Sequence, residues 1–244
     1  MNWIYCGIGA AAAAVLGVLV WCFLKWRKKN SFTPPVLTDW DRGHLAYHEA
    51  GHAVCFFLLP EVEKVTSITI DPSNEAFGMV RTAASVRYND TKEALLSSMT
   101  ALMGGGICEE VFLQDFTTSR YQDLQIARKI AFDMITRFGM GKELRNISLM
   151  DDGGMWFYSR EVRSVAEKEI CALLREASKR AEELIRANAD VIKLLVDELF
   201  EKGTMTESDV DEFVKKNIRK NKEGGRKCCR RSLVSGCSVR SQLW

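Results

Sequence analysis

The chain has 244 residues, of which 47% are hydrophobic and 27% charged, so it can bury the core of one mid-sized domain with appendages. Its formal net charge of +2 argues for neither a nucleic-acid partner nor an acidic substrate, and we expect no nucleic-acid partner. The eight cysteines include no CxxC pair, which excludes the dense disulfide framework of small secreted domains and favours reduced thiols.

An uncharged stretch runs from Trp3 to Leu24 near the start of the chain. As a helix it would be roughly 33 Å long, enough to cross a hydrocarbon core of about 30 Å. No basic segment precedes it and no small-x-small cleavage site follows, so we expect a retained membrane anchor rather than a cleaved signal peptide. The basic cluster Lys25–Lys29 places the rest of the chain on the cytoplasmic or matrix-equivalent side. Residues 1–29 are therefore predicted to be the anchor and its basic flank.

Residues 30–39 contain Pro34 and Pro35 and are expected to form a linker. The first helix of the following domain is predicted from about Arg42 to Leu59, with Asp39 or Asp41 as its cap. Two β-prone stretches then indicate a small hairpin, and further helices follow at helical apolar spacing. These strands and helices are expected at Val65–Ile70, Gly78–Ala83, Thr91–Met103, Gly106–Leu113, Tyr121–Phe138, Ser159–Glu201, with a break near Asn188, and Thr206–Asn217.

Residues 218–244 form a basic tail with little to bury, and we expect this tail to be disordered. Its segment Arg226–Arg231 contains the neighbouring Cys228 and Cys229. Binding of this segment to anionic lipid, with the cysteines acylated, is the less favoured alternative.

Within the first predicted helix, His48, Glu49 and His52 form an HExxH pattern, and all three histidines of the chain lie in this helix. Because positions 48 and 52 are four apart, both imidazoles project from one helix face and can share a zinc ion. Glu49 would lie beside the open coordination position, where it can accept a proton from water and later deliver it to a leaving amine. The pattern therefore predicts zinc-dependent hydrolysis.

His44 lies one turn earlier, but positions 44 to 52 span about 12 Å along a helix, too far for three rings to reach one ion. His44 is therefore expected to flank the site, and the third ligand must come from elsewhere. The spacing of the chain does not choose among the acidic candidates, which are Glu109, Glu110, Asp115, Asp123 and Asp133.

Several motifs in this order resemble the peptidase domain of the FtsH-type membrane AAA proteases, the M41 family. The resemblance covers about Arg42 to Asn217. It is carried by Ala46–Val54, by Gly104–Gly105 with Glu109–Glu110, by Thr117–Thr118 with Asp123–Leu124 and Ala127, and by Phe138–Met140.

The resemblance implies that His48 and His52 bind Zn²⁺ together with Asp123, that Glu49 is catalytic, and that Glu109 orients a ligand histidine. The fold it implies is mainly α, a zincin-like helical metallopeptidase domain in residues 40–217 with a small β hairpin or sheet, preceded by one transmembrane helix. The expected function is a membrane-anchored zinc endopeptidase that cuts unfolded or exposed protein segments. A hexameric homo-oligomer is also implied.

The sequence departs from the family pattern at Ser119–Gln122, where a small glycine-containing stretch ending in Asn is usual, and at Gly106, where Arg is usual. Both departures bear on the substrate cleft or subunit contacts. No GxxxxGK[ST] motif occurs and no ATPase module fits between anchor and peptidase domain. Either the chain cuts segments that are already unfolded or exposed, or an ATPase subunit acts in trans. The alternative function is a catalytically silent membrane subunit that assembles with ATPase-bearing relatives.

Overall fold

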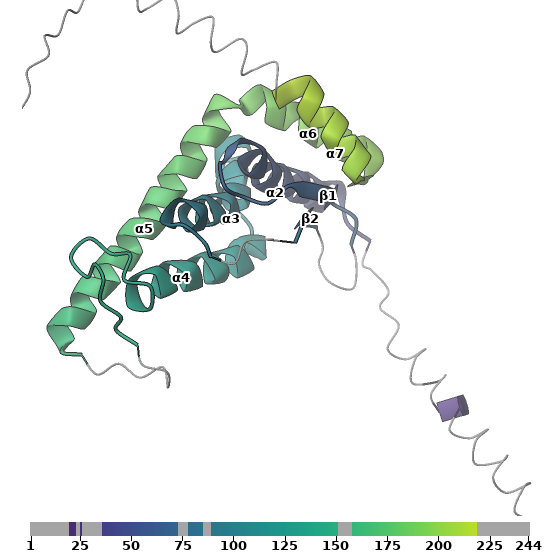
Figure 1. Ribbon diagram of the computed structural model, residues 1–244. Coiled ribbons are helices and arrows are strands. Elements are labelled where there is room, and N and C mark those ends of the chain that lie inside the picture. Colours follow the sequence, from purple (N-terminus) through teal and green to yellow (C-terminus); the bar gives the residue numbers. More distant parts are fainter. Residues whose placement is uncertain are drawn as a thin grey trace, which may run out of the picture. The chain divides into compact units, whose positions relative to one another are not determined.

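The computed structural model describes residues 20–22, 25, 36–72, 78–84, 89–150 and 158–218. These residues are mainly helical and include a small antiparallel sheet, as predicted (Figure 1). No helix in these ranges is both long enough and apolar enough to cross a membrane. The predicted anchor, the linker and the basic tail lie almost entirely outside the described residues. The fold below concerns the described residues from Leu37 onward, apart from Pro72, which form one compact unit.

Helix α2 spans Asp39–Leu58 and begins three residues earlier than predicted. Its cap is Thr38 rather than an aspartate: the Thr38 hydroxyl accepts from the Asp41 amide, and the Asp41 carboxylate accepts from the Thr38 amide at 2.9 Å. This reciprocal pair satisfies amides that the first turn leaves without partners. The helix then buries the small residues Ala46, Ala50 and Ala53 completely, so the stripe that carries the HExxH pattern faces the core.

Helix α3 spans Lys92–Leu113 without a break, so the prediction of two helices separated at Gly104–Gly105 is wrong. The glycines are required by packing. A Cβ atom on Gly104 would lie only 2.7 Å from the carbonyl oxygen of Gly51 in α2 and 2.9 Å from Cys55 Sγ. Tertiary contact between the two helices therefore outweighs the poor helix propensity of glycine, which amounts to about 1 kcal/mol per residue.

Three strands form the sheet: β1 (Val65–Thr69), β2 (Met79–Thr82) and β3 (Thr204–Met205), in the order β2-β1-β3. The predicted hairpin of β1 and β2 is confirmed, with Ile68 opposite Val80. Strand β3 was not predicted, because two residues give no recognisable alternation. Its pairing with β1 leaves β2 at the opposite edge of the sheet, where β2 contacts α2.

Helix α4 spans Tyr121–Thr136 and follows the 3₁₀ turn η1 (Thr118–Arg120). Helix α5 (Arg160–Ala187) runs along α3 and α4 (Figure 1). It ends at Asn188, which confirms the predicted break, and α6 (Ala189–Lys202) continues from there to pack on α2. The described part of the chain ends with α7 (Glu207–Phe213) and the π turn η2 (Val214–Ile218), which together occupy nearly the range predicted for one short helix.

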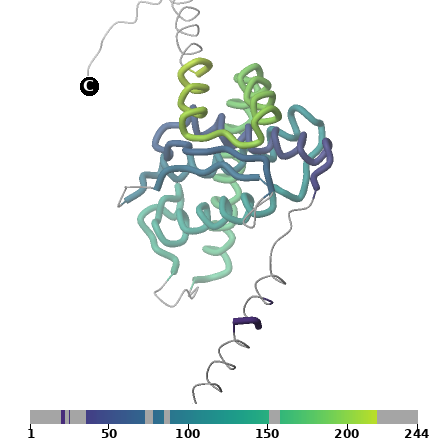
Figure 2. The backbone as a smooth tube through the Cα atoms, turned by 90° about the vertical axis from the view of Figure 1, so that its right-hand side faces the viewer, coloured from purple at the N-terminus to yellow at the C-terminus, as the bar shows by residue number. Residues whose placement is uncertain are grey.

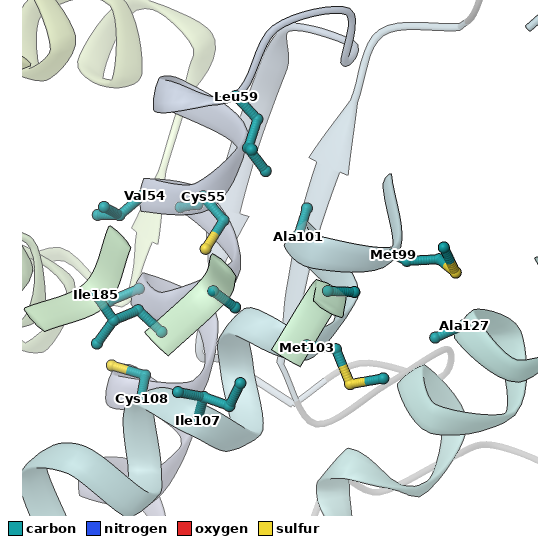
Figure 3. Packing of buried hydrophobic residues seen from close by; sticks show 14 of the residues in the cluster. Val54, Cys55, Leu59, Met99, Ala101, Met103, Ile107, Cys108, Ala127 and Ile185 are labelled. Carbon is teal, nitrogen blue, oxygen red and sulfur yellow. The ribbon is translucent and has the colours of Figure 1, made fainter. Parts of the chain in front are cut away.

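The core lies where α2, α3 and α5 meet. Val54 and Cys55 of α2, Cys108 of α3 and Ile185 of α5 are buried there (Figure 3). Figure 2 shows α6 and α7 at one end of this arrangement and α4 toward the other. Because α2 and α3 pack this closely and α5 packs against them, the three helices hold the side chains that project from α2 in fixed positions.

Candidate metal centre

Helix α2 presents the two histidines of the HExxH pattern on one buried face. The Nε2 atoms of His48 and His52 lie 3.0 Å apart, and the two side chains are almost fully buried. Residues four apart on a helix are neighbours on its surface, which explains why the two rings meet. The predicted convergence of the histidines is therefore present in the structure.

Asp123, in the first turn of α4, completes the cluster. Its Oδ2 atom lies 3.3 Å from Nε2 of both histidines, and the three ligand atoms are all within 4.8 Å of one another. Of the other carboxylates that the spacing left open, Glu109 contacts the outer nitrogen of the His48 ring, and the remaining three are engaged elsewhere. Glu110 pairs with Arg120 at 2.6 Å, Asp133 pairs with Arg137, and Asp115 accepts from the Phe116 amide. Among the acidic candidates, Asp123 is the residue whose carboxylate lies beside the Nε2 atoms of both histidines.

The outer nitrogen of each ring has an acceptor as its partner. His48 Nδ1 lies 2.5 Å from Glu109 Oε1, and His52 Nδ1 lies 2.8 Å from the carbonyl oxygen of Ala101. A carbonyl oxygen and an ionised carboxylate can only accept, so both Nδ1 atoms carry the proton and donate. In a neutral ring with this tautomer, Nε2 carries the lone pair, and both Nε2 atoms face Asp123 Oδ2. The Ala101 carbonyl is a site partner that sequence reasoning missed, because a main-chain acceptor leaves no residue signal.

Three electron-pair donors facing one another repel unless a cation lies among them. Two nitrogens bound to one zinc ion at about 2.0–2.1 Å would be roughly 3.3 Å apart at a tetrahedral angle, close to the separations observed here. Gly105 of α3 also faces this space, because a Cβ atom there would lie 2.8 Å from His48 Nε2. The chemistry of the donors and the missing side chain both fit a zinc ion.

Electrostatics in the cluster follow from the same contacts. Burial would lower the pKa of His48, but its hydrogen bonds with Asp123 and Glu109 outweigh burial and raise this pKa to about 9. Burial would likewise raise the pKa of Asp123, whereas the two histidines hold it well below its usual range. The site therefore attracts positive charge, which a proton supplies when no metal is bound.

Glu49 is buried beside the cluster, with 5% of its surface exposed. Burial raises the pKa of its carboxyl, and the neighbouring histidines only partly oppose this shift. The carboxylate lies against Gly78, the residue before β2: a Cβ atom on Gly78 would lie 2.6 Å from Glu49 Oε1. Glu49 is thus positioned between the histidine cluster and the edge of the sheet.

Glu109 of α3 is completely buried. It contacts Nδ1 of the His48 ring, whereas Asp123 lies at Nε2 of the same ring. Its Oε2 atom accepts from the Thr117 amide at 2.7 Å. Burial favours the neutral acid, but the hydrogen bonds with His48 and Thr117 outweigh it and lower the pKa of Glu109. The ionised carboxylate can therefore hold the His48 ring in place.

A mainly helical domain with an HExxH helix and a carboxylate from a second helix defines the class of HExxH metallopeptidases. The comparison with known proteins is more specific: the model of Peptidase family M41 matches residues 35–213. The chain belongs to this family, and the resemblance indicated by its motifs is confirmed.

The chain is similar to proteins named ATP-dependent zinc metalloprotease FtsH. Identity is 32% over 190 residues with that of Thermobaculum terrenum, covering 73% of this chain and 29% of the relative. It is 32% over 181 residues with that of Rubrobacter xylanophilus, covering 70% and 28%. With that of Bacillus subtilis it is 29% over 191 residues, covering 73% and 30%. The chain thus spans less than a third of the length of these relatives.

Proposed function

We propose that this protein is a zinc-dependent endopeptidase that hydrolyses peptide bonds in unfolded or exposed protein segments. The observation that carries the proposal is the convergence of His48 Nε2, His52 Nε2 and Asp123 Oδ2 beside the buried Glu49. Membership of family M41 and the zinc metalloprotease names of the relatives support it. The inferred roles are zinc ligation for the first three residues and proton transfer for Glu49.

Zinc bound by these residues would polarise the scissile carbonyl and lower the pKa of a bound water toward about 7. The protein's own contribution is positional. The hydrogen bonds at Nδ1 fix both rings, and Asp123 joins α4 to α2 across the site. Three protein ligands leave a coordination position open for water and substrate.

Glu49 acts as the proton carrier in this proposal. Its raised pKa makes the carboxylate a better base than a solvated glutamate, so it can take a proton from water during attack on the peptide carbonyl. The same carboxyl group can then return the proton to the leaving amine, which leaves as a neutral group. Burial keeps bulk water from competing for that proton.

We propose that the substrate binds as an extended strand along β2. This strand is at the edge of the sheet, and Gly78, which precedes it, contacts Glu49. A peptide added to the edge forms main-chain hydrogen bonds that accept varied side chains, as a peptidase for unfolded segments requires. The strand would also bring the peptide backbone to the proton carrier.

The remaining parts of the proposal concern the setting of the peptidase domain, residues 40–217. The apolar stretch Trp3–Leu24 and the basic cluster Lys25–Lys29 support a single-pass anchor with the domain on the cytoplasmic or matrix-equivalent side. The names of the relatives support an ATP-dependent assembly, formed as a homo-oligomer or with an ATPase subunit in trans. The silent-subunit alternative is not favoured, because the site residues are present and converge.

The test is cleavage of casein by the purified full chain in detergent, beside the Glu49→Gln variant. Glu49→Gln leaves the three proposed ligands in place, so both proteins should contain zinc. Loss of the proton carrier should lower the cleavage rate by about 10²–10⁴-fold. Equal cleavage by the two proteins, or a parent chain that contains zinc and cuts no peptide bond, would contradict the proposal.

A further inference from the structure

The Glu109 carboxylate has more partners than His48 alone. Its Oε1 atom accepts from His48 at 2.5 Å and from the Ser119 hydroxyl at 3.1 Å. Its Oε2 atom accepts from the Thr117 amide at 2.7 Å and lies 3.6 Å from Nδ1 of His44. Both oxygens of a completely buried carboxylate are therefore held by groups from α2 and from the segment before α4.

Ser119 occupies η1, between α3 and α4. Besides its bond to Glu109, its hydroxyl lies 3.3 Å from His48 Nδ1 and 2.5 Å from the Thr117 hydroxyl. Ser119 thus touches both members of the Glu109–His48 pair. It also belongs to the stretch Ser119–Gln122, in which the sequence departs from the family pattern.

His44 lies one turn before His48 on α2, and its buried Nδ1 atom has no hydrogen-bond partner among the described residues. At 3.6 Å its contact with Glu109 is longer than a hydrogen bond and is electrostatic. The exposed Trp40 covers the imidazole, with ring centroids 4.0 Å apart. The Nδ1 edge of the His44 ring faces the buried Glu109 carboxylate. Because Trp40 shields the ring, little water screens this interaction.

We propose that His44 and Ser119 are positioning residues that clamp the two oxygens of Glu109, so that this carboxylate holds His48 with Nε2 directed at the metal. The inference rests on the proposed zinc function. It assigns no contact with the metal or substrate to either residue: both act through Glu109.

The size of the effect follows from this indirect route. Residues that directly orient a metal ligand typically change metal affinity about 10 to 100-fold when removed. His44 and Ser119 each contact one oxygen of such a residue, and each oxygen also has another partner, so removing either should weaken zinc binding by less, about 3 to 10-fold. Their effects should disappear once Glu109 itself is replaced, since nothing remains for them to position.

The experiment measures zinc affinity of the full chain by competition with a chelator. His44→Leu and Ser119→Ala should each weaken binding about 3 to 10-fold, while His44→Asn, which keeps a donor near the Nδ1 position, should bind nearly as the parent does. In a Glu109→Gln background, neither His44→Leu nor Ser119→Ala should change affinity further. The thermal midpoint of each metal-free variant shows whether the fold is intact.

A second readout needs no metal. Because the chain has three histidines, ¹⁵N-histidine labelling resolves the Nδ1–H signal of His48, whose exchange with water reports its bond to Glu109. Faster exchange in both single variants supports the clamp. The clamp is overturned if the exchange rate and the zinc affinity do not change in the single variants. It is also overturned if the variants lose as much zinc affinity in the Glu109→Gln background as in the parent, or if their losses only follow a lower thermal midpoint. A parent chain that binds no zinc refutes the proposed function, and the exchange rates still decide the clamp.

Discussion

Replacing Gly105 with alanine should strongly weaken metal binding, although Gly105 has no side chain that could bind a metal. In Gly105→Ala the new Cβ atom would lie 2.8 Å from His48 Nε2 and closer still to His52 Nε2. Overpacking in an adaptable core costs about 1–3 kcal/mol because neighbours shift. In the proposed site the two nitrogens could not shift, since a bound zinc ion would fix each at about 2.0–2.1 Å. The upper value, about 3 kcal/mol, applies and corresponds to a loss of zinc affinity of about 100-fold.

The assay is chelator competition on the full chain, with Gly106→Ala as the matched control on the next residue of α3. A Cβ atom on Gly106 meets the Arg120 side chain at 3.1 Å, away from the rings, so its zinc affinity should stay within about threefold of the parent. Alanine also raises the helix propensity of α3 equally at both positions. Parent-like affinity in Gly105→Ala, or an equal loss in Gly106→Ala, would refute the reasoning.

Three other outcomes are expected. Asp123→Ala should be largely free of zinc, whereas Glu109→Gln should lose only about 10 to 100-fold in zinc affinity and still bind zinc at saturating metal. Metal analysis of the two variants measures this, and the reverse ranking would make Glu109 the ligand. Proline substitutions within Gly78–Ala83 should slow peptide cleavage while the protein stays folded and zinc-loaded, and unchanged cleavage would end the β2 proposal. Burial raises the pKa of Cys55 to about 12, so this thiol should resist iodoacetamide at about pH 8 while the exposed Cys171 reacts, as mass spectrometry can show. Rapid labelling of Cys55 in the folded protein would show that α2 and α3 are not packed as described.

The local part of the site could be predicted from the sequence. Helical periodicity determines that positions 48 and 52 share a face, and the chemistry of imidazole and carboxylate determines what they can do there. The break at Asn188 was equally predictable, because it depends on residues next to it. In each case the residues that decide the outcome are neighbours in the chain.

Features that depend on tertiary contact could not be predicted in this way. The glycines of α3 suggest a helix break until the backbone of α2 is seen against them. Several carboxylates have a plausible spacing, and only the placement of α4 brings Asp123 to the histidines. Strand β3 is defined by its partner β1 rather than by its own two residues.

The central claim is that His48, His52 and Asp123 hold one zinc ion. Anomalous diffraction at the zinc edge, from crystals of the zinc-loaded protein, tests it most directly. We predict a single strong peak among the Nε2 atoms of the two histidines and the Asp123 carboxylate, and no such peak at this position in Asp123→Ala. A zinc peak surrounded by other residues would contradict this claim. So would electron density that shows the three side chains in place but no zinc peak among them at saturating zinc.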